Sequence, residues 1–268
     1  MLDEVKFSAG AWFGGDWYEQ VAVAASHGFR AVEQLSWSAL DLSRAAEWLE
    51  RWSVTSTALI IESKDPEKSR PIAWNHGMVW EDSRGAFLSC LRETCEAARR
   101  MRVPNVIATT GNARGDVSHE AQMEICLDTL KEMAPIAEDY GVCLVLEPLN
   151  VIRDHRGFSL SLSSDAFRIV DEVASPSLRV LYDIYHQQIT EGNLIPTITA
   201  NIGKIGHFHI ADNPGRNQPG TGEINYANVF RAIRDAGYSR YLAFECGSTL
   251  PVDALCREMH ELIAPFED

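Results

Sequence analysis

Cysteine is sparse in this chain, and no two cysteines form a Cys-x-x-Cys pair. The cysteines lie at irregular spacings inside apolar segments, at Cys90, Cys95, Cys126, Cys143, Cys246 and Cys256. Such a pattern argues against a disulfide framework and against a zinc site built from thiolates. We therefore expect buried free thiols.

Positive charge is also scarce. The chain carries 24 Lys and Arg against 38 Asp and Glu, which gives a formal net charge of −14. The basic residues are scattered rather than gathered into a stripe with interleaved aromatic residues, and the net charge would repel a phosphate backbone. We expect no nucleic-acid partner.

Long hydrophobic runs are absent, although 46% of the residues are hydrophobic. A helix that crosses a bilayer needs about 20 consecutive apolar residues, and no segment approaches that length. The first residues, Met-Leu-Asp-Glu-Val-Lys, have neither the basic nor the apolar region of a signal peptide. These absences predict no membrane association and a cytoplasmic location.

The sequence does contain a regular alternation of short apolar segments with helical segments. The expected strands are residues 6–12, 29–35, 54–61, 105–109, 142–146, 178–182, 205–210 and 241–244. The expected helices are residues 16–28, 42–52, 84–102, 118–140, 164–173, 192–202, 226–236 and 251–263. A long polar loop, residues 62–82, separates the third strand from its helix.

This order of strand-then-helix units predicts the fold. Eight such units within 268 residues favour an α/β protein with a single (β/α)₈ TIM-barrel domain over residues 1–268. A Gly-x-Gly-x-x-Gly motif does not follow the first strand, which weakens the dinucleotide-binding alternative.

Polar residues at the ends of consecutive predicted strands are the main functional signal, because the active site of such a barrel lies at the carboxyl ends of its strands. The fifth to eighth strands end in Glu147, Asp183, His209 and Glu245. Carboxylates that converge in a buried mouth repel one another unless a cation joins them. Three carboxylates and an imidazole form a mostly hard ligand set, which suits Mn²⁺ or Mg²⁺, with Co²⁺ as a third choice. The competing interpretation is that each acid pairs with an arginine or caps the following helix.

Other polar residues near these strand ends are candidates for weaker roles. His186 follows Asp183 by three residues and is a candidate hydrogen-bond donor to substrate, unless it is a solvated loop histidine. Arg216, in a Pro-Gly-Arg turn, either holds a substrate carboxylate or hydroxyl or pairs with an acid. We expect Glu223 to be a loop anchor or a helix-start residue rather than a ligand, and His207 to face the helices, away from His209.

Aromatic residues cluster early in the chain, where all seven tryptophans precede residue 81. Trp12 and Phe13 follow the first strand and form either an apolar wall for a small substrate or part of the core. The segment from Trp74 to Trp80 lies in the long third loop, which makes a lid that carries His76 a hypothesis.

At these residues the sequence resembles the sugar isomerase/epimerase barrels of the xylose isomerase-like superfamily, and within it the hydroxypyruvate isomerases. The resemblance rests on Leu-Glu-Pro-Leu-Asn around Glu147, on Tyr-Asp-Ile-Tyr-His-Gln-Gln around Asp183, on residues 205–226 and on Phe-Glu-Cys at Glu245. It is strong over residues 142–247 and diffuse before them.

The resemblance implies roles for individual residues. The metal ligands of the family fall on Glu147, Asp183, His209 and Glu245. Its proton-transferring pair falls on Glu147 and Glu245, while His186 and Arg216 would contact a small carbonyl or sugar substrate. The implied reaction interconverts a small 2-keto and 2-hydroxy carbonyl compound through an enediolate, by metal-assisted proton transfer. The resemblance also implies a capacity to form homo-oligomers, of an order that the sequence does not specify.

Three alternatives stay open at this point. Hydroxypyruvate isomerases often carry glutamine where this chain has His209, whereas ketose 3-epimerases carry histidine, so epimerisation of a non-phosphorylated sugar is one alternative. A barrel that binds sugar without catalysis is another. A nuclease of the endonuclease IV type is the least favoured, because it needs further histidine ligands for zinc and a basic rim.

Overall fold

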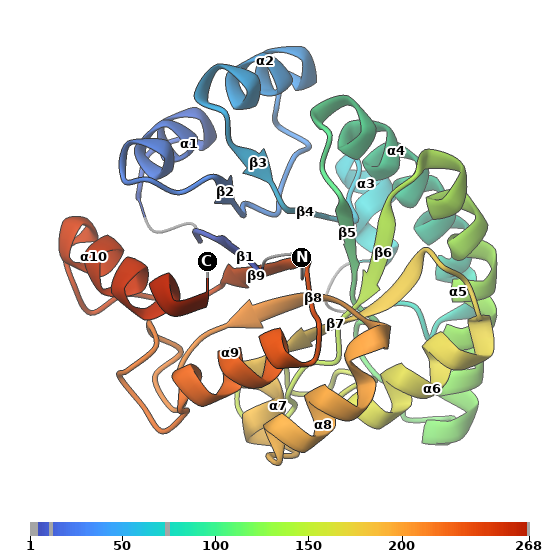
Figure 1. Ribbon diagram of the computed structural model, residues 1–268. Helices are drawn as coiled ribbons and strands as arrows, with labels where there is room; N and C mark the ends of the chain where they lie inside the picture. Colours follow the sequence, from blue (N-terminus) through green and yellow to red (C-terminus); the bar gives the residue numbers. More distant parts are fainter. Residues whose placement is uncertain (1–4, 11–12, 73–75, 267–268) are drawn as a thin grey trace.

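The computed structural model describes residues 5–10, 13–72 and 76–266, and it places parallel strands at the centre of a ring of helices (Figure 1). The strands are β1 (Lys6–Ser8), β2 (Ala31–Val32), β3 (Thr55–Ser56), β4 (Ala58–Ile60), β5 (Asn105–Ala108), β6 (Cys143–Leu146), β7 (Leu178–Asp183), β8 (Ile205–Ile210) and β9 (Tyr241–Phe244). The helices are α1 (Trp17–Ser26), α2 (Leu42–Trp52), α3 (Pro66–Ser69), α4 (Arg84–Met101), α5 (His119–Tyr140), α6 (Ser163–Val173), α7 (Ile184–Thr190), α8 (Leu194–Asn201), α9 (Tyr226–Asp235) and α10 (Val252–Ile263). The predicted α/β class is confirmed.

The strands pair in parallel. A 7-stranded sheet has the order β1-β9-β8-β7-β6-β5-β4, and β2 pairs with β3 in a separate 2-stranded sheet. Backbone hydrogen bonds connect the two sheets at β1, since the N–H of Ala9 donates to Ala31 O at 2.9 Å and the N–H of Glu33 donates to Ala9 O at 2.8 Å. Parallel pairing brings the carboxyl ends of neighbouring strands to the same side of the sheet.

The third expected strand, residues 54–61, is interrupted. It divides into β3 and β4 at Thr57, because β3 pairs with β2 whereas β4 pairs with β5. The second strand is shorter than expected, with regular pairing only at Ala31 and Val32. Both differences arise where the chain changes its pairing partner, which an apolar pattern does not reveal.

Most of the expected helices are present, with ends that follow from their capping residues. Asp16 and Glu19 form a capping box at the start of α1, and the Ser118 side chain accepts a hydrogen bond from Ala121 N at the start of α5. Gly141 ends α5 with φ of 68°, a conformation that favours glycine. Arg102 ends α4 in the same left-handed region, with φ of 56°.

Two expectations about helices need correction. The segment after β7 contains an additional helix, α7, which begins directly after Asp183 because that side chain accepts a hydrogen bond from His186 N. The predicted loop over residues 62–82 contains α3 and the short 3₁₀ helices Arg70–Ile72 and Glu81–Ser83. The helix α7 and the helices of this loop are all short, and short helices leave little periodicity in a sequence.

The interior surrounded by the strands has an apolar side and a polar side. Buried apolar side chains from β4 to β7 make a small separate cluster of Ala58, Ile107, Val145 and Leu181. The polar side holds the buried side chains of Ser8, Glu33, Thr57, His207 and His209. Buried polar groups are costly unless they are paired, so this polar side requires a specific hydrogen-bond network.

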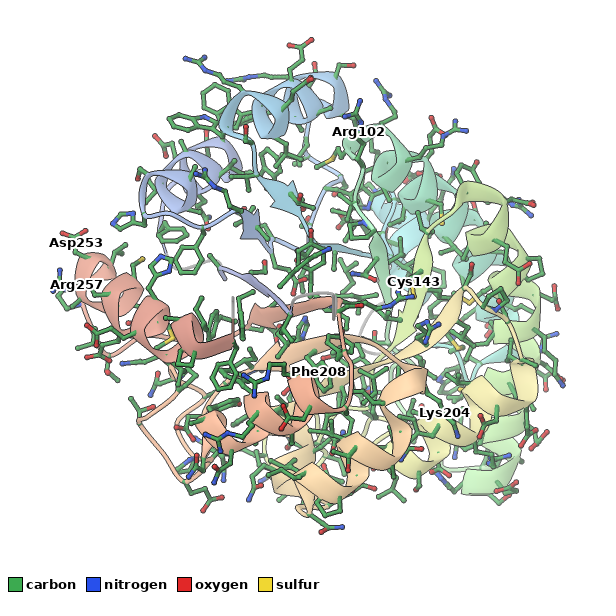
Figure 2. All side chains as sticks on the ribbon, viewed as in Figure 1. Arg102, Cys143, Lys204, Phe208, Asp253 and Arg257 are labelled. Carbon is green, nitrogen blue, oxygen red and sulfur yellow. The ribbon has the colours of Figure 1, made fainter. Side chains whose placement is uncertain are left out.

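The main core lies between the strands and the helices, and it contains Phe208 of β8, whose ring contacts those of Tyr182 and Tyr238. Asp253 and Arg257 project outward from α10 (Figure 2). All six cysteines are free thiols, as the sequence predicts, but only Cys90, Cys95, Cys126 and Cys256 are buried, whereas Cys143 and Cys246 are partly exposed. Burial raises the pKa of the Cys126 thiol to about 12. Across the described ranges, every helix is too short or too polar to cross a membrane.

Candidate metal and catalytic site

Four side chains at the carboxyl ends of β6, β7, β8 and β9 converge on one point. They are Glu147, Asp183, His209 and Glu245, which we call the acid–histidine cluster. One nitrogen or oxygen atom of each residue lies within 4.8 Å of the corresponding atoms of the others. Glu147, Asp183 and His209 are buried, and Glu245 is partly exposed. The geometry therefore brings together the four residues that the sequence singles out.

The donor atoms of this cluster fit a divalent cation. Asp183 Oδ2 and His209 Nδ1 are buried and have no hydrogen-bond partner in the described part of the chain. Buried polar atoms are normally paired, so two such atoms in one cluster are suited to a shared cation. Three carboxylates with one imidazole are ligands that Mn²⁺ and Mg²⁺ accept.

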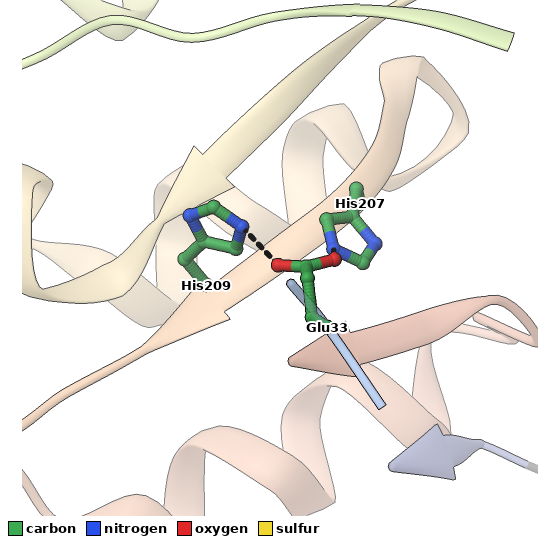
Figure 3. A group of neighbouring side chains, drawn as sticks. All are labelled: Glu33, His207 and His209. Atoms are coloured by element: carbon green, nitrogen blue, oxygen red, sulfur yellow. Dashed lines mark hydrogen bonds and ion pairs between the residues drawn. The ribbon is translucent and has the colours of Figure 1, made fainter. Parts of the chain in front are cut away.

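His209 connects the cluster to a second group of buried side chains. Its Nδ1 lies 3.3 Å from Glu147 Oε1 and 3.3 Å from Glu245 Oε2. Its Nε2 lies 2.7 Å from Glu33 Oε1, on the opposite edge of the ring (Figure 3). Burial disfavours the charged ring, but the charges of Glu245 and Glu33 outweigh burial and raise the pKa of His209 well above its usual 6.5.

The carboxylates of the cluster differ in their electrostatics. Burial raises the pKa of Glu147 and of Asp183, and the charge of Glu245 raises both further. Burial also opposes ionisation of Glu245, but the positive charges of His209 and Arg216 overcome it and lower the pKa of Glu245 to about 2. Without a cation these two carboxyl groups therefore favour the protonated form, and a bound cation would favour their ionised form.

His186 and Arg216 both border the cluster. The Nε2 of His186 lies 3.5 Å from Asp183 Oδ2 and has no hydrogen-bond partner in the described ranges, while its Nδ1 lies 2.5 Å from Asn150 Nδ2. Arg216 donates from one Nη to Glu245 Oε2 at 2.6 Å, and its guanidinium lies 5.4 Å from the centre of the Tyr185 ring. Both side chains are thus positioned at the mouth of the cluster rather than in solvent.

A buried carboxylate organises the loop that carries Arg216. The Asp212 side chain accepts hydrogen bonds from backbone N–H groups at 2.8–3.1 Å, and the donors are Asn213, Gly220, Gly222 and Ile224. Glycine is required at Gly222, where an added Cβ would lie 2.0 Å from Asn213 O. Glu223 accepts a hydrogen bond from the Asn213 side chain, which confirms its expected role as a loop anchor. The loop is therefore held in one shape.

A cavity of about 340 Å³ opens beside the cluster, and both Glu147 and Glu245 line it. Its other walls are mostly apolar and come from Leu35, Ile60, Ile61, Ile72, Phe87, Ile107, Leu149 and Phe158. Among the described residues no lysine, arginine or histidine lines the cavity. A cavity of this size at the lower end of the ligand-pocket range suits a small molecule.

The expectation that His207 faces the helices is wrong. Residues two apart in a strand point to the same face, so His207 lies on the same side of β8 as His209. Its Nε2 is 2.7 Å from Glu33 Oε2, and its side chain is fully buried in the interior.

Sequence reasoning also missed two acids near the site. Glu33 lies within the expected second strand, residues 29–35, and the two-residue spacing of His207 and His209 is the signal that could have indicated its role. Glu62 lines the cavity and accepts hydrogen bonds from the N–H groups of Trp37 and Ser38, both at 2.6 Å. Nothing in the sequence around Glu62 indicates these contacts.

The proposed aromatic and lid elements have mixed outcomes. Trp12 and Trp74 lie outside the described residues. The Phe13 ring lies 6.0 Å from the His27 ring and does not line the cavity. His76 stacks on Trp80 with ring centres 4.5 Å apart and pairs with Asp82 at 3.1 Å. A lid that carries His76 stays a prediction.

The fold and the site define a class of protein, in which parallel strands surrounded by helices carry a carboxylate–histidine cluster at their carboxyl ends. The sequence profile of the xylose isomerase-like TIM barrel family matches residues 21–264, and the chain belongs to this family. The resemblance predicted from the strand-end motifs is therefore confirmed.

Individual relatives agree with the family assignment. Hydroxypyruvate isomerase of Escherichia coli (strain K12) is 31% identical over 231 residues, which cover 86% of this chain and 87% of the relative. A 2-oxo-tetronate isomerase of Cupriavidus necator is 29% identical, with 85% of each chain covered. A crystal structure of AP endonuclease, family 2, from Brucella melitensis has a TM-score of 0.87 at 24% identity and covers 98% of this chain and 99% of its own. The last likeness shows the fold alone.

Proposed function

We propose that this protein is a metal-dependent isomerase that interconverts a small 2-keto and 2-hydroxy carbonyl compound, in the manner of its hydroxypyruvate isomerase relatives. The observation that carries the proposal is the convergence of Glu147, Asp183, His209 and Glu245 beside a cavity that both glutamates line. The two isomerases to which the chain is similar support the same reaction class.

The acid–histidine cluster would hold the cation, Mn²⁺ or Mg²⁺ before Co²⁺, through one donor atom of each of its four residues. When bound, a divalent cation polarises a carbonyl oxygen and makes the neighbouring C–H more acidic. The two unpartnered buried atoms, Asp183 Oδ2 and His209 Nδ1, support this assignment.

Glu147 and Glu245 would carry the proton transfer. Both carboxylates border the cavity, so both can reach a substrate carbon from β6 and from β9. Glu245, with its pKa lowered to about 2, is a carboxylate at neutral pH, the form that a proton acceptor requires. Glu147, which borders the same cavity from β6, would return a proton to the adjacent carbon.

Arg216 and His186 would orient the substrate. Arg216 offers a fork of N–H donors next to Glu245, and His186 offers an Nε2 without a hydrogen-bond partner in the described ranges. Among the described residues no lysine or arginine lines the cavity itself, and Arg216 is paired with Glu245, which favours a non-phosphorylated substrate. We further propose that the strands close into a (β/α)₈ barrel in which β3 and β4 count as one strand, that residues 1–268 form one domain, and that the protein acts in the cytoplasm.

Epimerisation of a non-phosphorylated ketose at carbon 3 is the second candidate. It is favoured by the histidine at position 209, which the ketose 3-epimerases of this superfamily share. Epimerisation needs return of the proton to the same carbon from the opposite face, whereas isomerisation needs return to the neighbouring carbon.

Glutamine substitutions test the roles of the two glutamates. Glu147→Gln and Glu245→Gln keep the size of each side chain but remove the proton acceptor, so each should lower turnover by at least about 100-fold. The measurement is turnover of hydroxypyruvate and of a panel of short ketoses by purified protein with added Mn²⁺. Circular dichroism should show a folded protein in each case.

Glu223→Gln is the matched control, since Glu223 lies on the neighbouring loop and bonds Asn213 and Gln188 rather than the cluster. It should retain most of the turnover. Near-normal turnover by either cluster variant would overturn the assignment of that glutamate.

A further inference from the structure

Glu33 bridges two histidines in the interior of the strands. Its Oε1 lies 2.7 Å from His209 Nε2, and its Oε2 lies 2.7 Å from His207 Nε2. The hydroxyl of Thr57 donates a third hydrogen bond to Oε2 at 2.7 Å. Figure 3 shows the carboxylate between the two rings. All of these side chains are buried.

The position of this bridge follows from the strand geometry. His207 and His209 are two residues apart in β8 and share one face, so a single carboxylate can reach both rings. Glu33 directly follows β2, and Thr57 lies between β3 and β4. The interruption of the third strand therefore places the hydroxyl that completes the bonding of Glu33.

The bridge determines which nitrogen of His209 faces the acid–histidine cluster. A carboxylate only accepts hydrogen bonds, so the Nε2 of His209 must carry the proton that it donates to Glu33. The opposite nitrogen, Nδ1, faces Glu147 and Glu245 at 3.3 Å. In a neutral ring the proton on Nε2 leaves the Nδ1 lone pair available to a cation.

We propose that Glu33 is a positioning residue that acts through His209, fixing the ring so that Nδ1 is presented to the cation site. This inference rests on the proposed function, because it concerns the cation of that site. His207 and Thr57 hold the second carboxylate oxygen, so Glu33 cannot rotate away from His209 without losing their bonds. The bridge thus connects the metal ligand on β8 to the strands on the other side of the interior.

A second metal site at Glu33, His207 and His209 is the competing interpretation, since these residues also form a compact group of potential ligands. The two imidazoles contact different oxygens of the carboxylate rather than one common point, and 2.7 Å is the length of a charge-assisted hydrogen bond. The group is fully enclosed, and none of its members lines the cavity beside the cluster. Hydrogen bonding accounts for all of these contacts.

Calorimetric titration with Mn²⁺, in the absence of substrate, tests the proposal. The amide of Glu33→Gln has one acceptor oxygen and can accept a hydrogen bond from only one of the two imidazoles. The variant should therefore bind Mn²⁺ roughly 10- to 100-fold more weakly than the wild type. Glu93→Gln removes an equal charge from an ion pair with Lys68 at the surface and should bind as the wild type does. The wild type should bind one ion per chain.

The outcomes separate this inference from the proposed function. If the wild type and Glu33→Gln bind Mn²⁺ equally well, the positioning role is wrong while the metal site stands. If the wild type binds two ions and Glu33→Gln binds one, the second metal site is correct instead. If the wild type binds no Mn²⁺, the proposed function fails together with the inference.

A measurement on the wild type covers the case in which Glu33→Gln does not fold. In protein labelled with ¹⁵N-histidine, the signals of His209 are assigned from their loss in His209→Gln. On addition of Mg²⁺ the Nδ1 signal of His209 should shift, while its Nε2 keeps a proton that exchanges slowly with water. Loss of the proton from Nε2 of His209, or a Mg²⁺-dependent shift at His207 larger than that at Nδ1 of His209, would overturn the proposal.

Discussion

At the scale of single residues, Glu147 and Glu245 are chemically identical but lie in different surroundings. Glu147 is buried and faces two other carboxylates, which raises its pKa, whereas Glu245 is paired with Arg216, and the positive charges of Arg216 and His209 help lower its pKa to about 2. Two acids whose environments separate their pKa values are suited to opposite steps of a proton transfer. Arg216 therefore contributes to the difference in pKa between Glu147 and Glu245.

Replacement of Arg216 by lysine should lower kcat/KM by roughly 10- to 100-fold, the equivalent of one hydrogen bond to a charged group. A lysine keeps the charge but has no planar fork to contact Glu245 Oε2 and a substrate oxygen together. Steady-state kinetics with the best substrate of the panel provides the measurement. Arg231→Lys, on the exposed face of α9, is the matched control and should behave as the wild type. An unchanged kcat/KM in Arg216→Lys would show that a single positive charge suffices there.

The cluster residues could be predicted from the sequence because each one ends an apolar strand, and parallel strands bring their carboxyl ends together. Glu33 and Glu62 could not be predicted in this way, because their partners come from distant segments: His207 and His209 for Glu33, and the backbone of Trp37 and Ser38 for Glu62. Contacts of this kind depend on side-chain positions across the interior, which periodicity does not encode.

At the scale of elements, strands and helices differ in how well their ends could be predicted. Helix ends follow local capping chemistry, so α2 and the limits of α5 agree with the sequence pattern. Strand ends depend on which strand lies alongside, so β2 is short and the third strand divides at Thr57. The same division places Thr57 against Glu33, so the interruption of the third strand lies next to the buried Glu33 bridge.

The first and last helices are joined by His27. This residue ends α1, its Nδ1 donates to Val23 O at 2.9 Å, and its Nε2 donates to Asp253 Oδ1 on α10 at 2.9 Å. The hydrogen bonds to Asp253 and to Val23 raise the pKa of His27 above 6.5. Because the folded protein favours the protonated ring, this contribution to stability is complete below pH 6.5 and is lost as the pH rises through the raised pKa.

Asp253→Asn should therefore lower the thermal midpoint slightly at about pH 5.5 and not at about pH 9, where His27 is neutral in both the folded and the unfolded chain. The effect should be small because the Asp253 side chain is 82% exposed. Calorimetric scans of the variant and the wild type at both pH values provide the test. A difference of equal size at the two pH values would show that the charge of His27 is not responsible.

At the scale of the whole molecule, the interior is divided between an apolar side, made of Ala58, Ile107, Val145 and Leu181, and a polar side centred on Glu33. The acid–histidine cluster lies at the carboxyl ends of the strands, beside a cavity of about 340 Å³ with mostly apolar walls. A mostly apolar wall next to a group of ionised ligands strengthens electrostatic interactions within the site. Such surroundings fit the proton transfer at carbon that we propose.

The most direct test of the central claim is proton exchange at carbon that depends on the cation. Purified protein is stripped of metal with a chelator and divided, and one half is reloaded with Mn²⁺. After the incubation described next, Mn²⁺ is removed before spectra are recorded. Each half is incubated in D₂O with hydroxypyruvate and with the panel of short ketoses, and deuterium at substrate carbon is measured by NMR. We predict deuterium incorporation by the reloaded protein and none by the stripped protein. Absence of exchange in both halves across the panel, or equal exchange in both, would contradict the account.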